Sequence, residues 1–439
     1  MRSVRHALLT GVRRLSAATA AGAVLITAPV TGADADDCDQ ACQIDWAWSA
    51  QRQNALPRTA FYDAPDPLPW APSGTLIRAE ATSEYVVRDK PVKAVRVLYH
   101  SRTSRGGDVA ASGVVLVPQD RPRPAGGWKV VVDAHGASGI ATGCAPSLMR
   151  DLYHGDQMVR FLEQGYAVVA PDYAGLGTTG RPELVNKTAE AEDIAGAVRS
   201  AHQAVPGLSG HWVLWGHSQG GGAALGFAER QLTRPVPGYR GTVVTSPAAD
   251  LPALAAHVAT TVPYGGFAPL LAQGAAYSDP KIDVTRLLTP VAQARLDSAG
   301  NGCLGVATAV YGDLTGPALT RPGYSSDPRF TRYLRDNSLG RQRVAGPVLF
   351  LQGGADTVTP QAINAKVAAE LRRNGSHVTY RVYDGLEHDT YGAVTGIDDG
   401  AMDDILAWVR DRWRSGGCAA SSHTSDGRRR SDQSPVRCG

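Results

Sequence analysis

The chain has 439 residues, which suits one large domain with insertions or two small domains. Charged residues make up 19% of it and hydrophobic residues 43%, an ordinary globular composition that excludes wholesale disorder. The formal net charge of +3 depends on the first 35 residues, which hold four arginines and one aspartate. Without them the charge is near zero, so no basic excess points to nucleic acid or to an anionic membrane.

The first 35 residues have the layout of a secretory signal peptide. Four arginines precede or open an apolar stretch that ends near residue 30, and Ala33-Asp34-Ala35 offers small residues for cleavage. A membrane anchor is disfavoured because the stretch is short and rich in Ala and Thr. We therefore expect segment 1–35 to be removed and the protein to be secreted. Arg13-Arg14 also fits a twin-arginine signal, so the export route stays open.

The cysteines all lie beyond the predicted cleavage site. They are Cys38, Cys42, Cys144, Cys303, Cys418 and Cys438. An even number of cysteines in an oxidising compartment indicates up to three disulfides. Metal binding is the weaker interpretation, because there is no C-x-x-C pair and the histidines do not cluster near the cysteines. We expect no metal and no other cofactor.

Segment 36–74 is rich in Pro, Asp and Trp, and we expect it to form an irregular N-terminal wrap. Two runs with many β-branched residues, at 92–100 and 109–117, predict an antiparallel hairpin. Short apolar runs then alternate with helical patterns. The predicted strands are 129–134, 166–170, 212–215, 242–245, 348–351 and 378–383, and the predicted helices are 151–164, 189–204, 220–232, 361–373 and 398–414. This alternation predicts an α/β fold with a mostly parallel sheet flanked by helices, which binds substrate at the carboxyl ends of its strands.

Segment 247–346 interrupts this alternation. It contains apolar helical stretches but no strong strand, and it is far longer than a crossover between two strands needs. We therefore expect an inserted helical cap over 247–346, between an N-terminal part of the core over 36–246 and a C-terminal part over 347–414. The tail at 415–439 is rich in Ser, Arg and Gly and is expected to be disordered.

The strongest motif is Gly-His-Ser-Gln-Gly at 216–220. It follows the predicted strand 212–215 and precedes a predicted helix, which is the context that a G-x-S-x-G nucleophile elbow requires. The serine of such an elbow sits on a strained turn, and Gly216 and Gly220 supply the small residues needed on either side. Ser218 is therefore the predicted nucleophile.

A serine hydroxyl needs a base to take its proton and an acid to orient that base. In elbow folds the order along the chain is serine, acid, histidine. Asp356 lies on a glycine turn after the buried strand 348–351, and His388 lies just beyond the strand 378–383. Their placement at successive strand ends predicts that Ser218, Asp356 and His388 form a catalytic triad.

Other residues compete for these roles. Asp384 and Asp389 are the rival acids, but both lie on the histidine's own loop. His217 and His135 are the rival bases. His217 is next to Ser218 on the elbow, where its side chain should point away from the serine hydroxyl.

His135 begins the sequence His-Gly-Ala-Ser-Gly, which follows the buried strand 129–134. Loops of this kind bring a backbone N–H next to the elbow and form an oxyanion hole together with the N–H of the residue after the nucleophile. We assign these donors to Ala137 and Gln219, with Ser138 as the alternative to Ala137.

Four segments together resemble the secretory lipase family (lipase A-like) of the α/β-hydrolases. They are His135-Gly-Ala-Ser-Gly, the Cys-Ala-Pro-Ser sequence beginning at Cys144, the Asp-Tyr-Ala-Gly-Leu-Gly sequence at 172–177, and Gly-His-Ser-Gln-Gly-Gly at the elbow. The resemblance covers roughly 70–414. It implies an α/β-hydrolase fold, a triad at the three residues assigned above, an oxyanion hole and a helical lid at 247–346. It also implies a disulfide from Cys144 to a lid cysteine, for which Cys303 is the candidate; the pairing of the other four stays open.

The predicted function is that of a secreted serine carboxylic-ester hydrolase, triacylglycerol lipase-like, acting on lipid or medium-chain esters. A serine peptidase or amidase, a carbohydrate acetyl esterase and a catalytically inactive binding module are the alternatives. The expected partner is a small-molecule ester or lipid, with transient contact with a lipid interface. We expect a monomer that does not bind nucleic acid.

Overall fold

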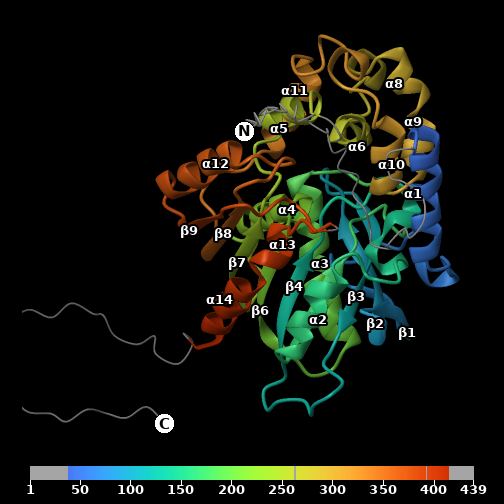
Figure 1. Cartoon of the computed structure of the whole chain (residues 1–439). Helices are drawn as coiled ribbons and strands as arrows, with labels where there is room; N and C mark the ends of the chain where they lie inside the picture. Colours follow the sequence, from blue (N-terminus) through green and yellow to red (C-terminus); the bar gives the residue numbers. More distant parts are fainter. Residues whose placement is uncertain (1–37, 262–263, 392, 415–439) are drawn as a thin grey trace, which may run out of the picture.

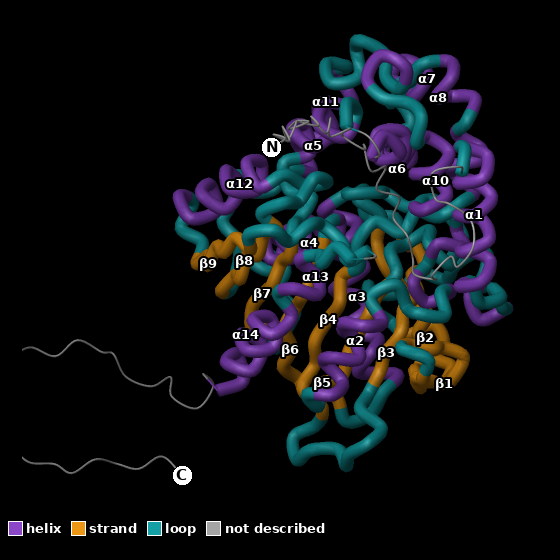
Figure 2. Tube along the Cα trace, viewed as in Figure 1, coloured by secondary structure: helices purple, strands orange, loops and turns teal. Residues whose placement is uncertain are grey.

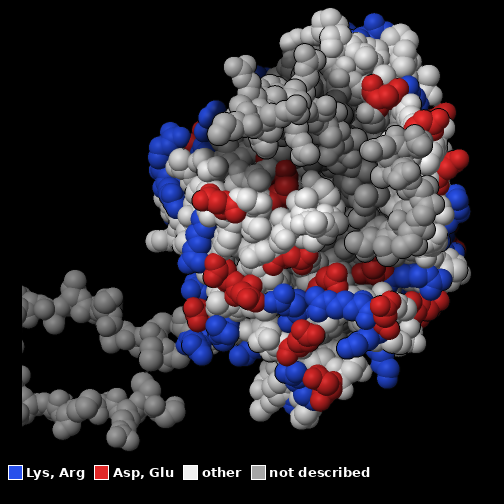
Figure 3. All heavy atoms as spheres, in the orientation of Figure 1, with Lys and Arg blue, Asp and Glu red and all other residues white. Residues whose placement is uncertain are grey.

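The computed structural model describes residues 38–261, 264–391 and 393–414. The predicted signal peptide and the predicted disordered tail, with Cys418 and Cys438, lie outside these residues. Within the described ranges, no helix is both long enough and apolar enough to cross a membrane. On the face shown in Figure 3, acidic and basic side chains are interspersed across the lower half, so that neither charge dominates there.

A nine-stranded sheet forms the centre of the molecule, with the strand order β1-β2-β3-β5-β4-β6-β7-β8-β9 (Figure 2). The strands are β1 (Leu76–Val87), β2 (Lys90–Arg102), β3 (Asp108–Leu116), β4 (Trp128–Ala134), β5 (Tyr166–Pro171), β6 (Leu208–His217), β7 (Tyr239–Thr245), β8 (Pro347–Gly353) and β9 (His377–Tyr383). The pairs from β1 to β3, and the pair of β3 with β5, are antiparallel, whereas all the pairs from β5 to β9 are parallel. The mostly parallel sheet is thus confirmed.

Helices cover both faces of this sheet. One face of the sheet is covered by α3 (Lys187–Ala204), α4 (Gln219–Arg230) and α12 (Gln361–Arg373). The other face is covered by α2 (Gly155–Glu163), α13 (Ile397–Gly400) and α14 (Met402–Arg414). Successive residues of a central strand face opposite layers, since Trp212 and Leu214 pack with the first helices and Val213 and Trp215 with the second. This explains why the sequences of the central strands are continuous apolar runs.

The segment between β7 and β8 forms a helical region with its own apolar core, which Figure 1 shows gathered over one end of the sheet. Its helices are α5 (Leu251–Val258), α6 (Phe267–Ser278), α7 (Val284–Leu287), α8 (Pro290–Ala294), α9 (Leu296–Asn301), α10 (Leu304–Tyr311) and α11 (Pro328–Asn337), with short 3₁₀ turns at Tyr264–Gly266 and Gly316–Ala318. We call this segment, 247–346, the inserted region.

The N-terminal segment differs from the irregular wrap expected for it. Residues Gln40–Asn54 form the helix α1, which begins where the Asp39 side chain accepts a hydrogen bond from the Cys42 backbone N–H. The 3₁₀ turn Ala60–Tyr62 follows. The helix packs on α10 and places Ala47 in the core of the inserted region. Its pattern was missed because most of its residues are exposed or only half-buried, so the contact with α10 leaves little periodic signal.

The strand β1 was also not predicted. Most of its side chains are exposed or half-buried, and a register shift interrupts its pairing with β2 between Thr82 and Tyr85. A strand of this kind shows no regular alternation of apolar and polar residues, because little of either face is buried. The predicted hairpin of 92–100 and 109–117 corresponds to β2 and β3.

Two disulfides lie within the described residues. The Cys144–Cys303 bridge, implied by the family resemblance, is present and joins the loop after β4 to the start of α10. The second bridge, Cys38–Cys42, spans the start of α1. Backbone contacts reinforce the first bridge, since the N–H of Leu304 donates to the carbonyl of Ser138 at 2.9 Å. The base of the inserted region is therefore attached to the loop that follows β4.

Candidate active site

Ser218 lies between the end of β6 and the start of α4, on a sharp turn. Its φ of 54° is in the left-handed region, which costs a non-glycine residue energy and is typical of a nucleophile elbow. The turn is held by neighbouring backbone, because the Ser218 N–H donates to the carbonyl of Thr245 and its carbonyl accepts from Ala248. The strained conformation is thus maintained by β7 and the segment that follows it.

The glycines of the motif are required by close backbone contacts. A Cβ atom at Gly220 would lie 1.8 Å from the carbonyl oxygen of Ala134, and one at Gly216 would lie 2.2 Å from the carbonyl oxygen of Gly220. Neither position can therefore hold a larger residue without movement of the backbone. The motif is a packing requirement of the turn as well as a sequence signature.

The structure brings Ser218, His388 and Asp356 together from three different loops. The Ser218 hydroxyl donates to His388 Nε2 at 2.8 Å, and His388 Nδ1 donates to Asp356 Oδ2 at 2.9 Å. All three side chains are buried. This is the geometry in which a base takes the serine proton while an acid fixes the tautomer of the base.

Asp356 is held by a set of donors besides His388. Its Oδ1 accepts from the backbone N–H groups of Val358 and Thr359, and its Oδ2 accepts from the Gln352 side chain and the Thr359 hydroxyl. Burial raises the pKa of Asp356, but the charge of His388 and hydrogen bonds from His388, the Ser246 side chain and the Thr359 N–H outweigh it and lower the pKa below its ordinary value. The carboxylate therefore stays ionised while buried.

The environment of His388 favours its protonated form. Burial lowers its pKa, but the carboxylates of Asp356, Asp389 and Asp398 outweigh burial and raise the pKa to about 9. The imidazolium that would form during proton transfer is thus stabilised by negative charge on more than one side.

The rival bases and acids are directed elsewhere. His217 contacts Thr245 Oγ1 and Asp389 rather than the Ser218 hydroxyl. His135 donates from its Nδ1 to the carbonyl of Gly136, and burial lowers its pKa to about 3, so it stays neutral. Asp384 is exposed.

The loop after β4 lies beside Ser218, as the oxyanion prediction requires. Ala137 lines the same pocket as Ser218 and Gln219. The Ala137 carbonyl accepts from the Tyr153 hydroxyl at 2.9 Å, which holds the peptide unit that also carries the Ser138 N–H. Gln219 opens α4, so its N–H has no partner inside the helix and is available to a ligand. The role of these N–H groups, and of Ser138 as the alternative donor, remains a prediction.

One residue of this region was not anticipated from the sequence. Glu190, in the first turn of α3, accepts a hydrogen bond from the Gln219 side chain at 2.6 Å. Burial raises the pKa of Glu190 well above its ordinary value. The contact fixes the residue that follows the nucleophile. A glutamate within a helical pattern gives no sequence signal for this role, because only the packing of α3 on α4 brings the pair together.

An apolar pocket opens beside Ser218. Its walls come from the core, from α5 and α6 of the inserted region, and from the loop that carries Asp356. It is lined by Ala137, Leu184, Val185, Ser218, Gln219, Ala248, Leu251, Leu254, Val258, Phe267, Leu271, Val358 and Thr359. All but three of these side chains are apolar, so the pocket suits an apolar ligand next to the serine.

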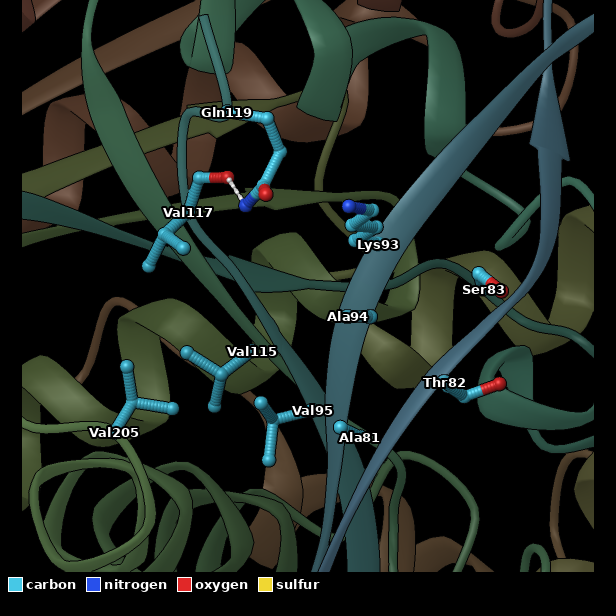
Figure 4. A pocket seen from close by; sticks show the side chains of 10 residues that line it. All are labelled: Ala81, Thr82, Ser83, Lys93, Ala94, Val95, Val115, Val117, Gln119 and Val205. Carbon is cyan, nitrogen blue, oxygen red and sulfur yellow. Dashed lines mark hydrogen bonds between the residues drawn. The ribbon is translucent and has the colours of Figure 1, made fainter. Parts of the chain in front are cut away.

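A second pocket, shown in Figure 4, lies away from these residues, on strands β1 to β3. It is lined by Ala81, Thr82, Ser83, Lys93, Ala94, Val95, Val115, Val117, Gln119 and Val205. The labelled side chains include no histidine, and the Thr82 hydroxyl donates to the Glu84 carboxylate at 3.3 Å. The lining therefore lacks the pair of histidine and acid that lies beside Ser218.

The group of His217, His388 and Asp389 brings two imidazoles and a carboxylate within 4.8 Å of one another. Both nitrogens of His388 already bond Ser218 and Asp356, and His217 bonds Asp389. We therefore assign these atoms to the hydrogen-bonded set around the serine and not to a metal.

Comparison with known proteins identifies a sequence family and several structures with a similar fold. The secretory lipase family model matches residues 153–420. None of the curated proteins matches the chain. Lipase A of Candida antarctica has a similar structure, with a TM-score of 0.68, 17% identity, and coverage of 82% of this chain and 87% of that one. The rice cell wall degrading esterase LipA of Xanthomonas oryzae has a TM-score of 0.60 at 19% identity, covering 78% of this chain and 97% of that one. At these identities the two structures show a shared α/β-hydrolase fold.

Proposed function

Because the chain belongs to the secretory lipase family, we propose that it is a secreted serine carboxylic-ester hydrolase that uses Ser218, His388 and Asp356. The family shows a hydrolase of the lipase and esterase type, and the structural neighbours support it by sharing the fold. The observation that carries the proposal is the continuous set of hydrogen bonds from the Ser218 hydroxyl through His388 to Asp356, next to an apolar pocket.

The first half of the reaction forms an acyl-enzyme. His388 Nε2 takes the proton of Ser218 as its Oγ attacks the ester carbonyl carbon, while Asp356 stabilises the imidazolium. The N–H groups of Ala137 and Gln219 hold the negative oxygen of the tetrahedral intermediate. His388 then gives its proton to the leaving alcohol as the bond from carbon to the alcohol oxygen breaks.

In the second half, His388 takes a proton from water, whose oxygen attacks the acyl carbonyl. The carboxylic acid leaves, and the proton returns to the Ser218 oxygen. Every proton in the cycle passes through His388 Nε2, so only the fraction of enzyme with a neutral His388 can begin the cycle.

Secretion is part of the proposal. The Cys144–Cys303 and Cys38–Cys42 bridges are typical of an oxidising compartment. The family description supports the same conclusion, and the predicted signal peptide at 1–35 would direct export by either route.

The apolar pocket predicts a preference for acyl chains longer than acetyl. Each methylene that leaves water for this pocket contributes about 0.8 kcal/mol, so kcat/KM should rise roughly threefold to fourfold per methylene until the pocket is full. The measurement is a series of p-nitrophenyl esters from acetate to palmitate. Hydrolysis of aminoacyl amides faster than of any ester would contradict the proposal in favour of a peptidase, and activity confined to acetyl esters would favour an acetyl esterase.

A variant tests whether this pocket holds the acyl chain. Leu254, on α5, lines the pocket, and Leu254→Trp would fill part of it. We expect kcat/KM for the octanoate ester to fall at least about tenfold, and that for the acetate ester to change less than about threefold. Leu232→Trp is the matched control, because Leu232 is exposed beyond the end of α4. An equal loss for both esters would place the acyl chain elsewhere.

The pH dependence follows from His388. Its pKa is raised to about 9, so most molecules carry a protonated His388 near neutral pH and cannot accept the serine proton. We expect kcat/KM for a soluble ester to rise with pH, nearly tenfold per unit, and to level off around pH 9. The measurement is a profile from pH 6 to 10, corrected for spontaneous hydrolysis. A profile that is flat from pH 6 upward would show that His388 is neutral there.

A further inference from the structure

A second carboxylate lies beside His388, and the mechanism above gives it no role. Asp389 follows His388 in the loop after β9, and its Oδ1 lies 3.0 Å from His217 Nε2. His217 is the last residue of β6, directly before Ser218. Its other nitrogen, Nδ1, lies 3.1 Å from Thr245 Oγ1 at the end of β7. The His217 ring is thus held at both nitrogens, and it holds Asp389.

The two imidazoles lie close to each other. The ring centroids of His217 and His388 are 4.7 Å apart, with their planes tilted by 48°. Because both nitrogens of His388 bond Ser218 and Asp356, Asp389 has no hydrogen bond to make with that ring. The Asp389 carboxylate can act on His388 in two ways. Its charge lies beside the ring, and its hydrogen bond to His217 joins the loop of His388 to the elbow.

We propose that Asp389, held by His217, is a positioning residue that docks the His388 loop on the elbow and stabilises the imidazolium form of His388. The inference rests on the proposed function, since it assigns His388 as the base. Asp356 fixes the tautomer from the Nδ1 side, whereas Asp389 supplies negative charge beside the ring. His217 keeps that charge in place.

Other titratable groups surround the same site. By element they are Asp356 after β8, Glu387 and Asp389 on the loop of His388, Asp398 and Asp399 on α13, His217 on β6, Asp133 on β4, and Tyr153 and His154 before α2. Burial raises the pKa of Asp398 to about 6, so Asp398 is ionised above that pH. It therefore contributes a constant charge in the alkaline range where His388 titrates.

The electrostatics of Asp389 agree with the geometry. Burial raises its pKa, but the imidazoles of His388 and His217 outweigh burial and lower the pKa below its ordinary value. In return, the Asp389 charge is one of the causes that raise the pKa of His388. The two residues thus stabilise each other's charged forms.

The test is Asp389→Asn, which keeps the size of the side chain and removes its charge. Without that charge the pKa of His388 falls, so the acid limb of the kcat/KM profile should move to lower pH by about one unit. The alkaline plateau of kcat should fall about threefold to tenfold, since the imidazolium formed in the transition state is less stabilised. Asp384→Asn is the matched control, because Asp384 is an exposed carboxylate on the same loop and should leave the profile unchanged.

Two substitutions of His217 distinguish the effect of its hydrogen bond to Asp389 from the effect of the Asp389 charge. His217→Gln can still donate a hydrogen bond to Asp389 and should resemble the wild type, whereas His217→Phe keeps a ring but removes the donor and should shift the profile toward that of Asp389→Asn. Thermal unfolding of each variant shows whether it is folded.

Direct titration of His388 by NMR in wild type and Asp389→Asn gives a readout that does not depend on activity. A lower His388 pKa in the variant supports the inference, and an unchanged or higher pKa overturns it. A wild-type protein without ester hydrolysis would instead refute the proposed function. A folded His217→Phe variant with the wild-type profile would remove His217 from the inference.

Discussion

Replacing Ser218 by alanine is expected to lower kcat for ester hydrolysis by about 10⁴-fold to 10⁶-fold, with KM changed little. The variant loses the atom that we propose attacks the carbonyl carbon, while the apolar pocket and the predicted oxyanion donors remain. Residual hydrolysis by water held in the site would account for any remaining rate. The measurement is single-turnover and steady-state hydrolysis of a medium-chain p-nitrophenyl ester.

The same substitution should abolish labelling by a fluorophosphonate. In the wild type we expect to find the label on Ser218 by peptide mass spectrometry, since this hydroxyl bonds His388, the proposed base. Ser209→Ala is the matched control, because Ser209 lies near the other end of β6 and contacts His211 instead of the site. Retention of most of the activity in Ser218→Ala would refute the whole mechanism, and labelling of another serine would relocate the nucleophile.

Removal of the Cys144–Cys303 bridge is expected to have the largest effect on stability. The two cysteines are 159 positions apart, so on the chain-entropy model the bridge stabilises the folded state by about 4–5 kcal/mol. The double variant Cys144→Ser, Cys303→Ser should unfold at a Tm roughly 5–15 °C lower. Differential scanning calorimetry and denaturant unfolding measure this change.

The second bridge provides the control for this experiment. Cys38 and Cys42 are only 4 positions apart, so the same model assigns their bridge about 2 kcal/mol. The variant Cys38→Ser, Cys42→Ser should therefore lose less than half as much stability. Equal losses for the two variants would show that loop length does not govern the contribution of the Cys144–Cys303 bridge.

Activity should fall as well when the longer bridge is removed. Gly139 and Cys303 pair through a β-bridge, and the Leu304 N–H bonds the carbonyl of Ser138. Through these contacts the start of α10 holds the loop that carries Ala137. Loosening it should disorder one of the two predicted oxyanion donors, so kcat should fall more than KM rises.

The parallel strands and the elbow could be predicted because their signals are local. A strand buried on both faces must be apolar along its length, and a sharp turn around Ser218 needs glycine at Gly216 and Gly220. The order of residues after successive strands placed Asp356 and His388 at the same edge of the sheet. These features follow from a few neighbouring residues and from the handedness of parallel sheets.

Other features depend on contacts between distant segments. The helix α1 is stabilised by its packing on α10, and the strand β1 is stabilised by its pairing with β2. Neither segment has a periodic pattern of apolar residues of its own. The link between Glu190 and Gln219 needs α3 to lie beside α4. No local pattern reports such contacts, because each requires that two segments be placed to within a hydrogen-bond distance.

The choice among the three candidate carboxylates depends partly on local sequence and partly on contacts between distant segments. The sequence by itself determined that Asp356, Asp384 and Asp389 lie near the carboxyl ends of β8 and β9. Only the tertiary structure decided that Asp356 bonds His388, that Asp389 bonds His217 and that Asp384 is exposed. The physical reason is that strand order sets which loops meet, whereas hydrogen bonds of about 3 Å depend on the packed positions of all the surrounding side chains.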